Sequence, residues 1–268
     1  MKRKPQILLT NDDGIESPGL WAAADALEDL GYVHVVAPRD QQSGTGRSLP
    51  EISDGIIDVQ EMHIKDQPWT VYAVGGTPAQ AVLHAYLEIL EGPPDLVVAG
   101  INYGQNVGNG VTISGTVGAA LEAAALGIPA LAISLEMPDT FHLSYSKEID
   151  FSCAAHFTKY FGRLLLEKEM PHDVDVLKVE IPSAATSETP WELTRISPVR
   201  FYETMAPRRE TWKDPGKLGY QQVTSAEQHP RNSDVYVLGA LGRVSVTPLS
   251  LDLTSRLDFK DFDAFLRE

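Results

Sequence analysis

The sequence has few of the residues on which several common kinds of site depend. It contains one cysteine, Cys153, so it can form no internal disulfide and has no second thiol for a zinc or redox pair. Its seven histidines stand singly, without a His-x-Asp or His-x-x-x-His pair, which disfavours a zinc hydrolase. It has no Gly-x-x-x-x-Gly-Lys-Ser/Thr loop, so hydrolysis of nucleoside triphosphates by a P-loop is disfavoured as well.

Positive charge is also scarce. The chain has 22 Lys and Arg against 37 Asp and Glu, a formal net charge of -15. The molecule as a whole therefore repels polyanions, which argues against a nucleic-acid polymer or an anionic membrane as partner. An anionic substrate would need local positive charge. A bound metal could supply it, which is a reason to look for carboxylate ligands.

Long hydrophobic runs are missing. The most apolar region, Val117 to Ser134, is interrupted by Glu122, Gly127 and Pro129, so it reads as helix, turn and strand instead of a membrane span. The basic stretch Met1 to Pro5 leads at once into a strand-like run, so no signal peptide is visible. We therefore expect a cytoplasmic protein that has no membrane partner.

The apolar residues that are present form short runs alternating with helical patterns. Hydrophobic residues make up 43% of the chain and charged residues 22%, the balance of a globular protein. The alternation predicts an α/β fold of three α/β/α layers, Rossmann-like, with a mainly parallel sheet covered on both faces. The expected strands are Gln6–Thr10, His34–Pro38, Trp69–Val74, Asp95–Ile101, Ala130–Leu135 and Val174–Ile181; the expected helices are Pro18–Leu30, Pro78–Leu90, Thr116–Leu126 and Asp150–Glu169.

The first of these helices carries clear boundary signals. Ser17 can cap its start, Pro18 suits its first position, and Gly31 stands just past its end. Between residues 43 and 66, in contrast, the pattern is lost among Gly, Ser, Asp and Ile, which indicates a long loop or a short antiparallel excursion beside the sheet.

After Pro182 the alternation stops. Residues 194–202 and 219–223 read as the arms of a long hairpin around the polar stretch 207–217. An arm this polar has little core of its own, so it packs on another subunit or is a mobile loop. Further expected elements are a strand, Arg243–Leu249, and a terminal helix, Phe259–Leu266. We treat 1–268 as one domain, with an α/β catalytic core at 1–182 and a C-terminal hairpin, strand and helix at 183–268.

The strongest local signal follows the first predicted strand, where residues 10–14 read Thr-Asn-Asp-Asp-Gly. In an α/β sheet, ligands bind beyond the carboxyl ends of the strands. Asp12 and Asp13 can converge in a turn, and two ionised carboxylates held close together are best relieved by a hard divalent cation. Gly14 would let backbone approach the ion or substrate. A plain Asx turn that caps a helix is the alternative.

Three other segments add polar groups at strand or helix ends. The Gly- and Ser-rich loop 41–48 offers hydroxyl and N–H donors to an anion. The loop 100–108 offers asparagine oxygens, but its glycines do not have dinucleotide-binding spacing. Residues 114–116, Ser-Gly-Thr, begin a helix and so form a phosphate site by dipole and free N–H groups. Taken singly, each has a plainer interpretation, as a flexible loop or as ordinary N-capping by Ser114 or Thr116.

Taken together and in order, these residues resemble the signature of the SurE 5'/3'-nucleotidases. The similarity also covers the strand around Val244–Leu249 and hence nearly the whole chain. The matching blocks are Thr10-Asn11-Asp12-Asp13-Gly14, Ala37-Pro38 followed by Gln42-Ser43-Gly44, Gly76-Thr77-Pro78-Ala79, Gly100-Ile101-Asn102 with Gly104, Asn106 and Gly108, and Ser114-Gly115-Thr116-Val117-Gly118-Ala119-Ala120 with Glu122.

The resemblance implies roles for individual residues. It implies one divalent metal ion per subunit, Mg²⁺ or Mn²⁺, held by Asp12, Asp13, Ser43 and Asn102. It places Ser114, Gly115 and Thr116 close to the phosphate, with Asn11 and Gly44 as further substrate contacts. A homodimer or homotetramer is implied too, with the hairpin extension used in oligomerisation. The chain departs from the family pattern at Gln80, Arg47 and Glu180, where an acidic residue, a His and an Asn are common.

The hypothesis is metal-dependent hydrolysis of nucleoside 5'- and 3'-monophosphates, with a metal-activated water attacking phosphorus in line. Asn106 is a candidate catalytic residue together with the two acids. It and the helix start would neutralise charge on the phosphoryl oxygens. Arg47, Arg208 and Arg209 are candidate anion contacts. Which carboxylate assists the water stays open. An aspartyl-phosphate route would want Asp-x-Asp, whereas this chain has Asp-Asp-Gly.

Two other functions fit the same residues. A nucleotide-binding regulatory protein could keep the fold and the anion site while turning over little substrate. A broad-specificity acid phosphatase or exopolyphosphatase would share the metal site and differ in the walls of the pocket.

Overall fold

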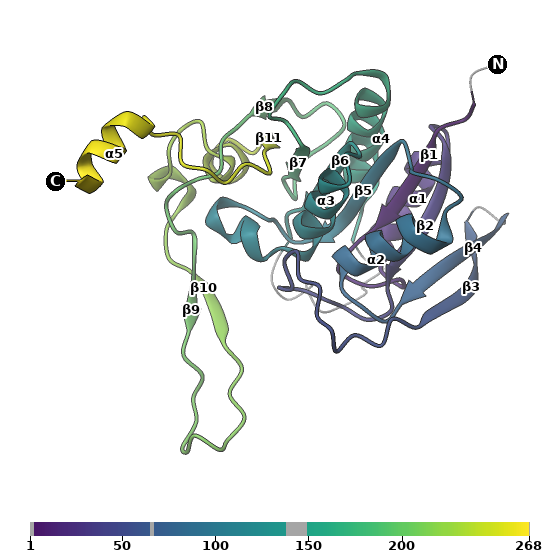
Figure 1. Ribbon diagram of the computed structural model, residues 1–268, viewed down its shortest axis with the longest axis horizontal. Helices are drawn as coiled ribbons and strands as arrows, with labels where there is room; N and C mark the ends of the chain where they lie inside the picture. Colours follow the sequence, from purple (N-terminus) through teal and green to yellow (C-terminus); the bar gives the residue numbers. More distant parts are fainter. Residues whose placement is uncertain (1–2, 65–66, 138–148, 268) are drawn as a thin grey trace.

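The computed structural model describes residues 3–64, 67–137 and 149–267, and within them nine strands form one sheet. In sheet order the strands are β3 (Ile57–Ile64), β4 (Gln67–Val74), β2 (Tyr32–Pro38), β1 (Gln6–Thr10), β5 (Leu96–Tyr103), β6 (Ala130–Leu135), β7 (Val176–Ile181), β11 (Val244–Leu249) and β8 (Trp191–Leu193). In this order the six strands that begin with β4 and end with β7 run parallel, while β3 and β11 pair antiparallel at either side (Figure 1).

Helices cover both faces of this sheet, which confirms the predicted three-layer α/β/α architecture. On one face α1 (Pro18–Leu27) packs against α4 (Ser152–Glu167); on the other α2 (Pro78–His84) packs against α3 (Gly115–Ala125). Each pair closes its own apolar core against the strands. Strands β5, β6 and β7 are buried along their whole length, as expected for parallel strands covered on two sides.

The helix boundaries differ from the predicted ones in local detail. Ser17 occupies the N-cap position of α1 but its side chain makes no capping bond, so only the backbone part of that prediction holds. The helix ends at Leu27 because the N–H of Leu30 turns back to the Leu27 carbonyl, at 2.8 Å. The helix expected at 78–90 is α-helical only to His84 and continues as a π-helix, η1 (Ala85–Ile89).

The region between residues 43 and 66 contains a strand, so the antiparallel alternative is the observed one. β3 pairs with β4 along its full length. Farther along, a 3-10 helix, η2 (Gly108–Ile113), precedes α3 and was not predicted.

The C-terminal part joins the sheet through β8 and β11 and then leaves it. The hairpin formed by β9 (Tyr202–Met205) and β10 (Gly219–Gln222) projects from the body, and α5 (Phe259–Arg267) lies at the far end of the chain (Figure 1). The first arm predicted at 194–202 was wrong. Thr194 directly follows β8 instead and is held to β11, because its N–H donates to the Val246 carbonyl at 2.9 Å and its hydroxyl bonds the side chains of Ser245 and Thr247.

The base of the hairpin is closed by a buried histidine. His229 lies between the hydroxyls of Ser197, at 2.7 Å, and Thr224, at 2.8 Å, and its ring packs edge-on against Phe201. Two short helices, η4 (Ala226–Gln228) and η5 (Tyr236–Ala240), flank this residue in sequence.

Acid should loosen this hairpin base. Burial lowers the pKa of His229, although the charge of Asp234 acts in the opposite direction. Since the folded pKa lies below the unfolded value of about 6.5, protonation favours the unfolded state, and stability falls as pH drops through that value. Melting temperatures measured at about pH 5 and about pH 8 test this. His229→Gln should show a smaller difference between the two; an equal difference would contradict the assignment.

Among the described residues, no helix is long and apolar enough to cross a membrane. The cytoplasmic location stays a prediction.

Candidate active site

The turn after β1 brings the two predicted acids into the interior. The side-chain amide of Asn11 donates to the Gly14 carbonyl at 3.0 Å and accepts from the Gly14 N–H at 3.2 Å, and Gly14 has a positive φ of 98°. The Asn11 side chain therefore closes this turn, but it does not cap a helix as the plainer interpretation expected, because the N-cap of α1 is Ser17. The turn leaves Asp12 and Asp13 only 4% and 2% exposed.

Asp12 meets the start of α3. The Thr116 hydroxyl donates to Asp12 Oδ1, and the backbone N–H groups of Gly115 and Thr116 are close enough to lower the pKa of this carboxylate. A Cβ built on Gly115 would lie 2.7 Å from Asp12 Cβ, so only glycine permits this approach. Ser114 caps the helix by accepting the Val117 N–H at 3.1 Å. The structure thus brings the acids and residues 114–116 together, 104 positions apart in sequence.

Asp13 bonds the other two predicted segments, the end of β5 and the loop 41–48. Its Oδ2 accepts the Tyr103 N–H at 3.1 Å, at the end of β5, and its Oδ1 receives a long bond of 3.4 Å from Gln41. The same Gln41 amide bonds Ser43 Oγ at 3.1 Å, which places Ser43 beside this acid.

The loop that carries Ser43 is anchored on α3 by an ion pair. Arg47 Nε lies 2.6 Å from Glu122 Oε2, and the Glu122 side chain is buried. A Cβ on Gly118 would come 2.2 Å from the carbonyl oxygen of Gly46, so the loop lies directly on the helix. Arg47, predicted as a possible anion contact, is thus engaged in holding the loop.

Asn102 lies at the end of β5 and is 7% exposed. Its amide nitrogen donates to the Gly104 carbonyl at 2.7 Å, which leaves the amide oxygen as the group that can bind a cation. Because Tyr103 bonds Asp13, Asn102 is held next to the two acids by the backbone of its neighbour.

The electrostatics of the acid pair favour a cation. Burial raises the pKa of Asp12, partly offset by the bonds from Thr116 and Gly115. The pKa of Asp13 is raised well above its usual range, first by burial and second by the negative charge of Asp12. A bound divalent cation would counter both effects, because it stabilises the ionised form of each carboxylate.

The donor set fits a hard metal ion. Among the described residues there is no group of three or more His, Cys, Asp and Glu side chains that could hold a metal. The candidate set has two carboxylates, one hydroxyl and one amide oxygen, all of them oxygen donors. Mg²⁺ prefers such ligands and keeps several waters, whereas structural zinc sites use sulfur and nitrogen.

Asn106 lies in the loop after β5, on the side toward β7. Its side-chain amide donates to Ser134 Oγ at 3.1 Å and its N–H to Glu180 Oε2 at 2.8 Å. Gly44, the other loop residue predicted to contact substrate, is exposed with a positive φ of 78°. Arg208 and Arg209 are in the loop that joins β9 to β10, on the projecting hairpin (Figure 1).

Sequence reasoning missed the groups that hold these residues in place. Gln41 bridges two candidate ligands, and no local pattern distinguishes it from its neighbour Gln42. Lys178 and Glu180 did leave a signal, since two charged residues at alternate positions share one face of a strand that is otherwise apolar.

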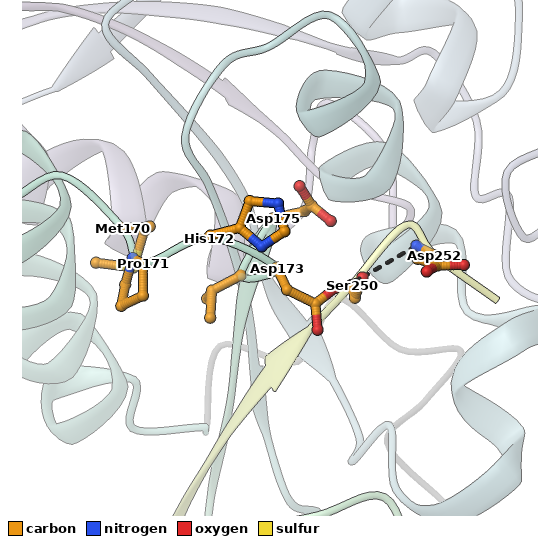
Figure 2. A pocket seen from close by; sticks show the side chains of 8 residues that line it. Met170, Pro171, His172, Asp173, Asp175, Ser250 and Asp252 are labelled. Atoms are coloured by element: carbon orange, nitrogen blue, oxygen red, sulfur yellow. Dashed lines mark hydrogen bonds between the residues drawn. The ribbon is translucent and has the colours of Figure 1, made fainter. Parts of the chain in front are cut away.

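A separate pocket of about 510 Å³ lies at the end of the sheet where the parallel strands begin (Figure 2). It is formed where the chain enters β7 and leaves β11, and the side chains of Asp173, Asp175 and Asp252 lie around it in Figure 2. The candidate site lies at the other end, beyond the carboxyl ends of the parallel strands, so this pocket is not part of it. Its lining residues are Met170, Pro171, His172, Asp173, Val174, Asp175, Ser250 and Asp252.

Comparison with known proteins identifies the family of this chain. The family model described as Survival protein SurE matches residues 7–203. The chain belongs to the SurE family. A SurE relative from Thermococcus kodakarensis, named 5'-nucleotidase SurE, is 40% identical and covers 96% of each chain; one of the same name from Methanosarcina mazei is 37% identical and covers 98% of each.

A solved SurE structure has the same fold. The crystal structure of SurE protein from Aquifex aeolicus superposes with a TM-score of 0.70 at 34% identity, covering 98% of this chain and 100% of that one. The family resemblance noted in the sequence is therefore confirmed over nearly its whole length. Departures at Arg47 and Glu180 fall on residues that support the site.

Proposed function

We propose that the chain is a metal-dependent phosphomonoesterase that hydrolyses nucleoside 5'-monophosphates, and also 3'-monophosphates, to nucleoside and phosphate. The observation that carries the proposal is the contact of Asp12 with the start of α3 beside a second buried acid. That contact supports a cation site and a phosphate site that lie next to each other. The names of the relatives, 5'-nucleotidase SurE, support a nucleotide substrate.

Asp12, Asp13, Ser43 and Asn102 would hold one Mg²⁺ or Mn²⁺ per subunit. When bound, the ion would polarise the phosphoryl group and lower the pKa of a coordinated water. The donors at the start of α3 hold the carboxylate of Asp12, so a phosphoryl group bound there shares them with that acid. The partial positive charge of these donors would then stabilise both the Asp12 carboxylate and the phosphoryl group.

Asn106 would take the other side of the phosphoryl group. Its amide has two N–H donors, of which Ser134 accepts one, so a second donor remains for a phosphoryl oxygen. The amide nitrogen and the amide oxygen of Asn11 both bond the backbone of Gly14, so Asn11 shapes the turn. Its contact with substrate stays a prediction. The base that assists the attacking water stays open between the two acids.

A panel of substrates tests this function. Pure protein is incubated with 5'-AMP, 5'-GMP, 3'-AMP, p-nitrophenyl phosphate and polyphosphate, each with and without Mn²⁺. We expect phosphate release from the nucleotides that depends on the metal. Release from p-nitrophenyl phosphate or polyphosphate alone would favour a broad phosphatase or exopolyphosphatase. Nucleotide binding without release would favour the regulatory alternative.

We also propose a homodimer or homotetramer. The hairpin and α5 expose large apolar side chains, with Trp212 91% exposed and Phe259, Phe262 and Phe265 on the terminal helix all exposed. Such side chains are stabilised when a second subunit covers them. Light scattering on a size-exclusion column should give two or four times the mass of one subunit, and a monomeric mass at micromolar concentration would contradict this.

A further inference from the structure

A buried group of three charges lies directly beneath the loop that carries Asn106. Lys178 and Glu180 stand on one face of β7, and Asp234 precedes η5; all three are fully buried. Lys178 Nζ is 3.3 Å from Glu180 Oε1 and 3.3 Å from Asp234 Oδ2. Its third contact is the carbonyl oxygen of Asn106 at 2.8 Å. An ammonium has three donors, and these three acceptors use them all.

The two carboxylates complete the hold on the loop. Glu180 Oε2 accepts the N–H of Asn106, and Glu180 Oε1 also accepts the hydroxyl of Ser134 at 3.3 Å. That hydroxyl in turn accepts the side-chain amide of Asn106. The N–H, the carbonyl and the amide of Asn106 are therefore all fixed by this group or by a residue bonded to it.

Asp234 extends the same hold to the C-terminal part of the chain. Its Oδ2 accepts the N–H of Gly108 at 3.0 Å, two residues beyond Asn106. Its Oδ1 accepts the N–H groups of Ser197, at 3.0 Å, and Val235, at 2.9 Å. Two segments distant in sequence, around Gly108 and around Ser197, thus meet at the carboxylate of Asp234.

The composition of this group is unfavourable for stability alone. One cation and two anions leave a net negative charge in the interior, and burial raises the pKa of Glu180 although Lys178 opposes the rise. Apolar residues of similar volume often replace a buried ion pair without loss of stability. What charged groups supply and apolar ones cannot is a set of directed bonds to one loop.

We propose that Lys178, Glu180 and Asp234 are positioning residues that fix Asn106 in the orientation needed to bind the phosphoryl group. The inference rests on the proposed function, because it gives Asn106 a role in that reaction. Displacing a catalytic group by about 1 Å can lower a rate by about 100-fold.

The test is a set of kcat and KM measurements on 5'-AMP with Mn²⁺. Glu180→Ala removes the acceptor of the Asn106 N–H and should lower kcat by about 10- to 100-fold, with KM changed by less than about threefold. Glu180→Gln keeps an acceptor oxygen and should recover kcat to within about fivefold of the wild type.

A double variant separates positioning from a general loss of structure. In an Asn106→Ala background, Glu180→Ala should change kcat by no more than about twofold, since the residue through which it acts is gone. Thr194→Val is the matched control: it removes buried hydrogen bonds on the same sheet but touches no residue of the Asn106 loop. It should lower the melting temperature and leave kcat unchanged.

The outcomes distinguish this inference from the proposed function. No phosphate release by the wild type would overturn the proposed function itself. Wild-type activity that Glu180→Ala leaves intact, or losses that add fully in the double variant, would overturn the positioning role while the function stands. If Glu180→Ala does not fold, Ser134→Ala, which removes only the hydroxyl that holds the Asn106 amide, replaces it in the same cycle.

Discussion

Asp13→Asn should abolish metal-dependent phosphate release while the protein stays folded. Loss of an outer-shell partner of a metal ligand costs about 10- to 100-fold, so loss of a ligand carboxylate should lower kcat/KM by at least about 100-fold. The variant is isosteric and removes one of two buried acids that raise each other's free energy when ionised. The activity assay therefore needs a stability measurement beside it.

The stability readout has a defined sign. The raised pKa of Asp13 means that its ionisation disfavours the folded state above its unfolded pKa near 3.8, so in metal-free buffer near neutral pH the variant should melt no lower than the wild type. Added Mn²⁺ should raise the melting temperature of the wild type only, because a ligand stabilises the state that binds it, by about 2.7 kcal/mol at 100 times its Kd.

Asp173→Asn is the control for this experiment. Asp173 is an exposed acid at the pocket where the parallel strands begin, at the end of the sheet away from the candidate site. Its positive φ of 69° suits asparagine. We expect wild-type kcat/KM and a wild-type response to Mn²⁺. Equal loss of activity in the two variants would mean that the effect of Asp13→Asn comes from net charge and not from a ligand.

Gly115→Ala should have the second largest effect. The added Cβ would lie 2.7 Å from Asp12 Cβ and 2.9 Å from Asp12 Oδ2, distances that real Cβ atoms do not keep. Either Asp12 or the start of α3 must shift, and a shift of about 1 Å is expected to cost about 100-fold in kcat/KM. Affinity for Mn²⁺, measured by calorimetry, should fall with it.

Gly110→Ala provides the comparison for Gly115→Ala. Gly110 lies in η2, five residues before Gly115, and nothing stands within 4 Å of the Cβ it would gain. It should keep the activity and the Mn²⁺ affinity of the wild type. If Gly115→Ala were as active as Gly110→Ala, the close approach of Asp12 to the helix would not matter for the reaction.

Much of the fold could be predicted because its signals are local and repeat. Each strand from β1 to β7 in the parallel part is a short apolar run, and α1, α2 and α3 carry Pro at N1 or a Ser or Thr cap. β8 has only three residues and a mixed burial pattern, so periodicity could not show it. The hairpin arm was misplaced because Thr194, polar and β-branched, reads equally well in either sheet.

The residues proposed to bind the metal and the phosphate could be predicted from the sequence, but the residues that hold them in place could not. Asp12, Asp13 and residues 114–116 stand at element ends, where ligand-binding groups are expected, and their contact follows from the parallel order of β1 and β5. The bond from Gln41 to Ser43 depends on how a loop folds back. So does the meeting of Lys178 with Asp234, which are 56 positions apart and brought together only by the antiparallel return of β11.

Anomalous diffraction at the manganese edge, from crystals grown with Mn²⁺ and orthovanadate as a phosphate mimic, tests the central claim most directly. One peak per subunit should lie about 2.0 to 2.3 Å from carboxylate oxygens of Asp12 and Asp13, with the vanadate between that ion and the start of α3. A peak elsewhere, or vanadate bound away from residues 114–116, would contradict the account.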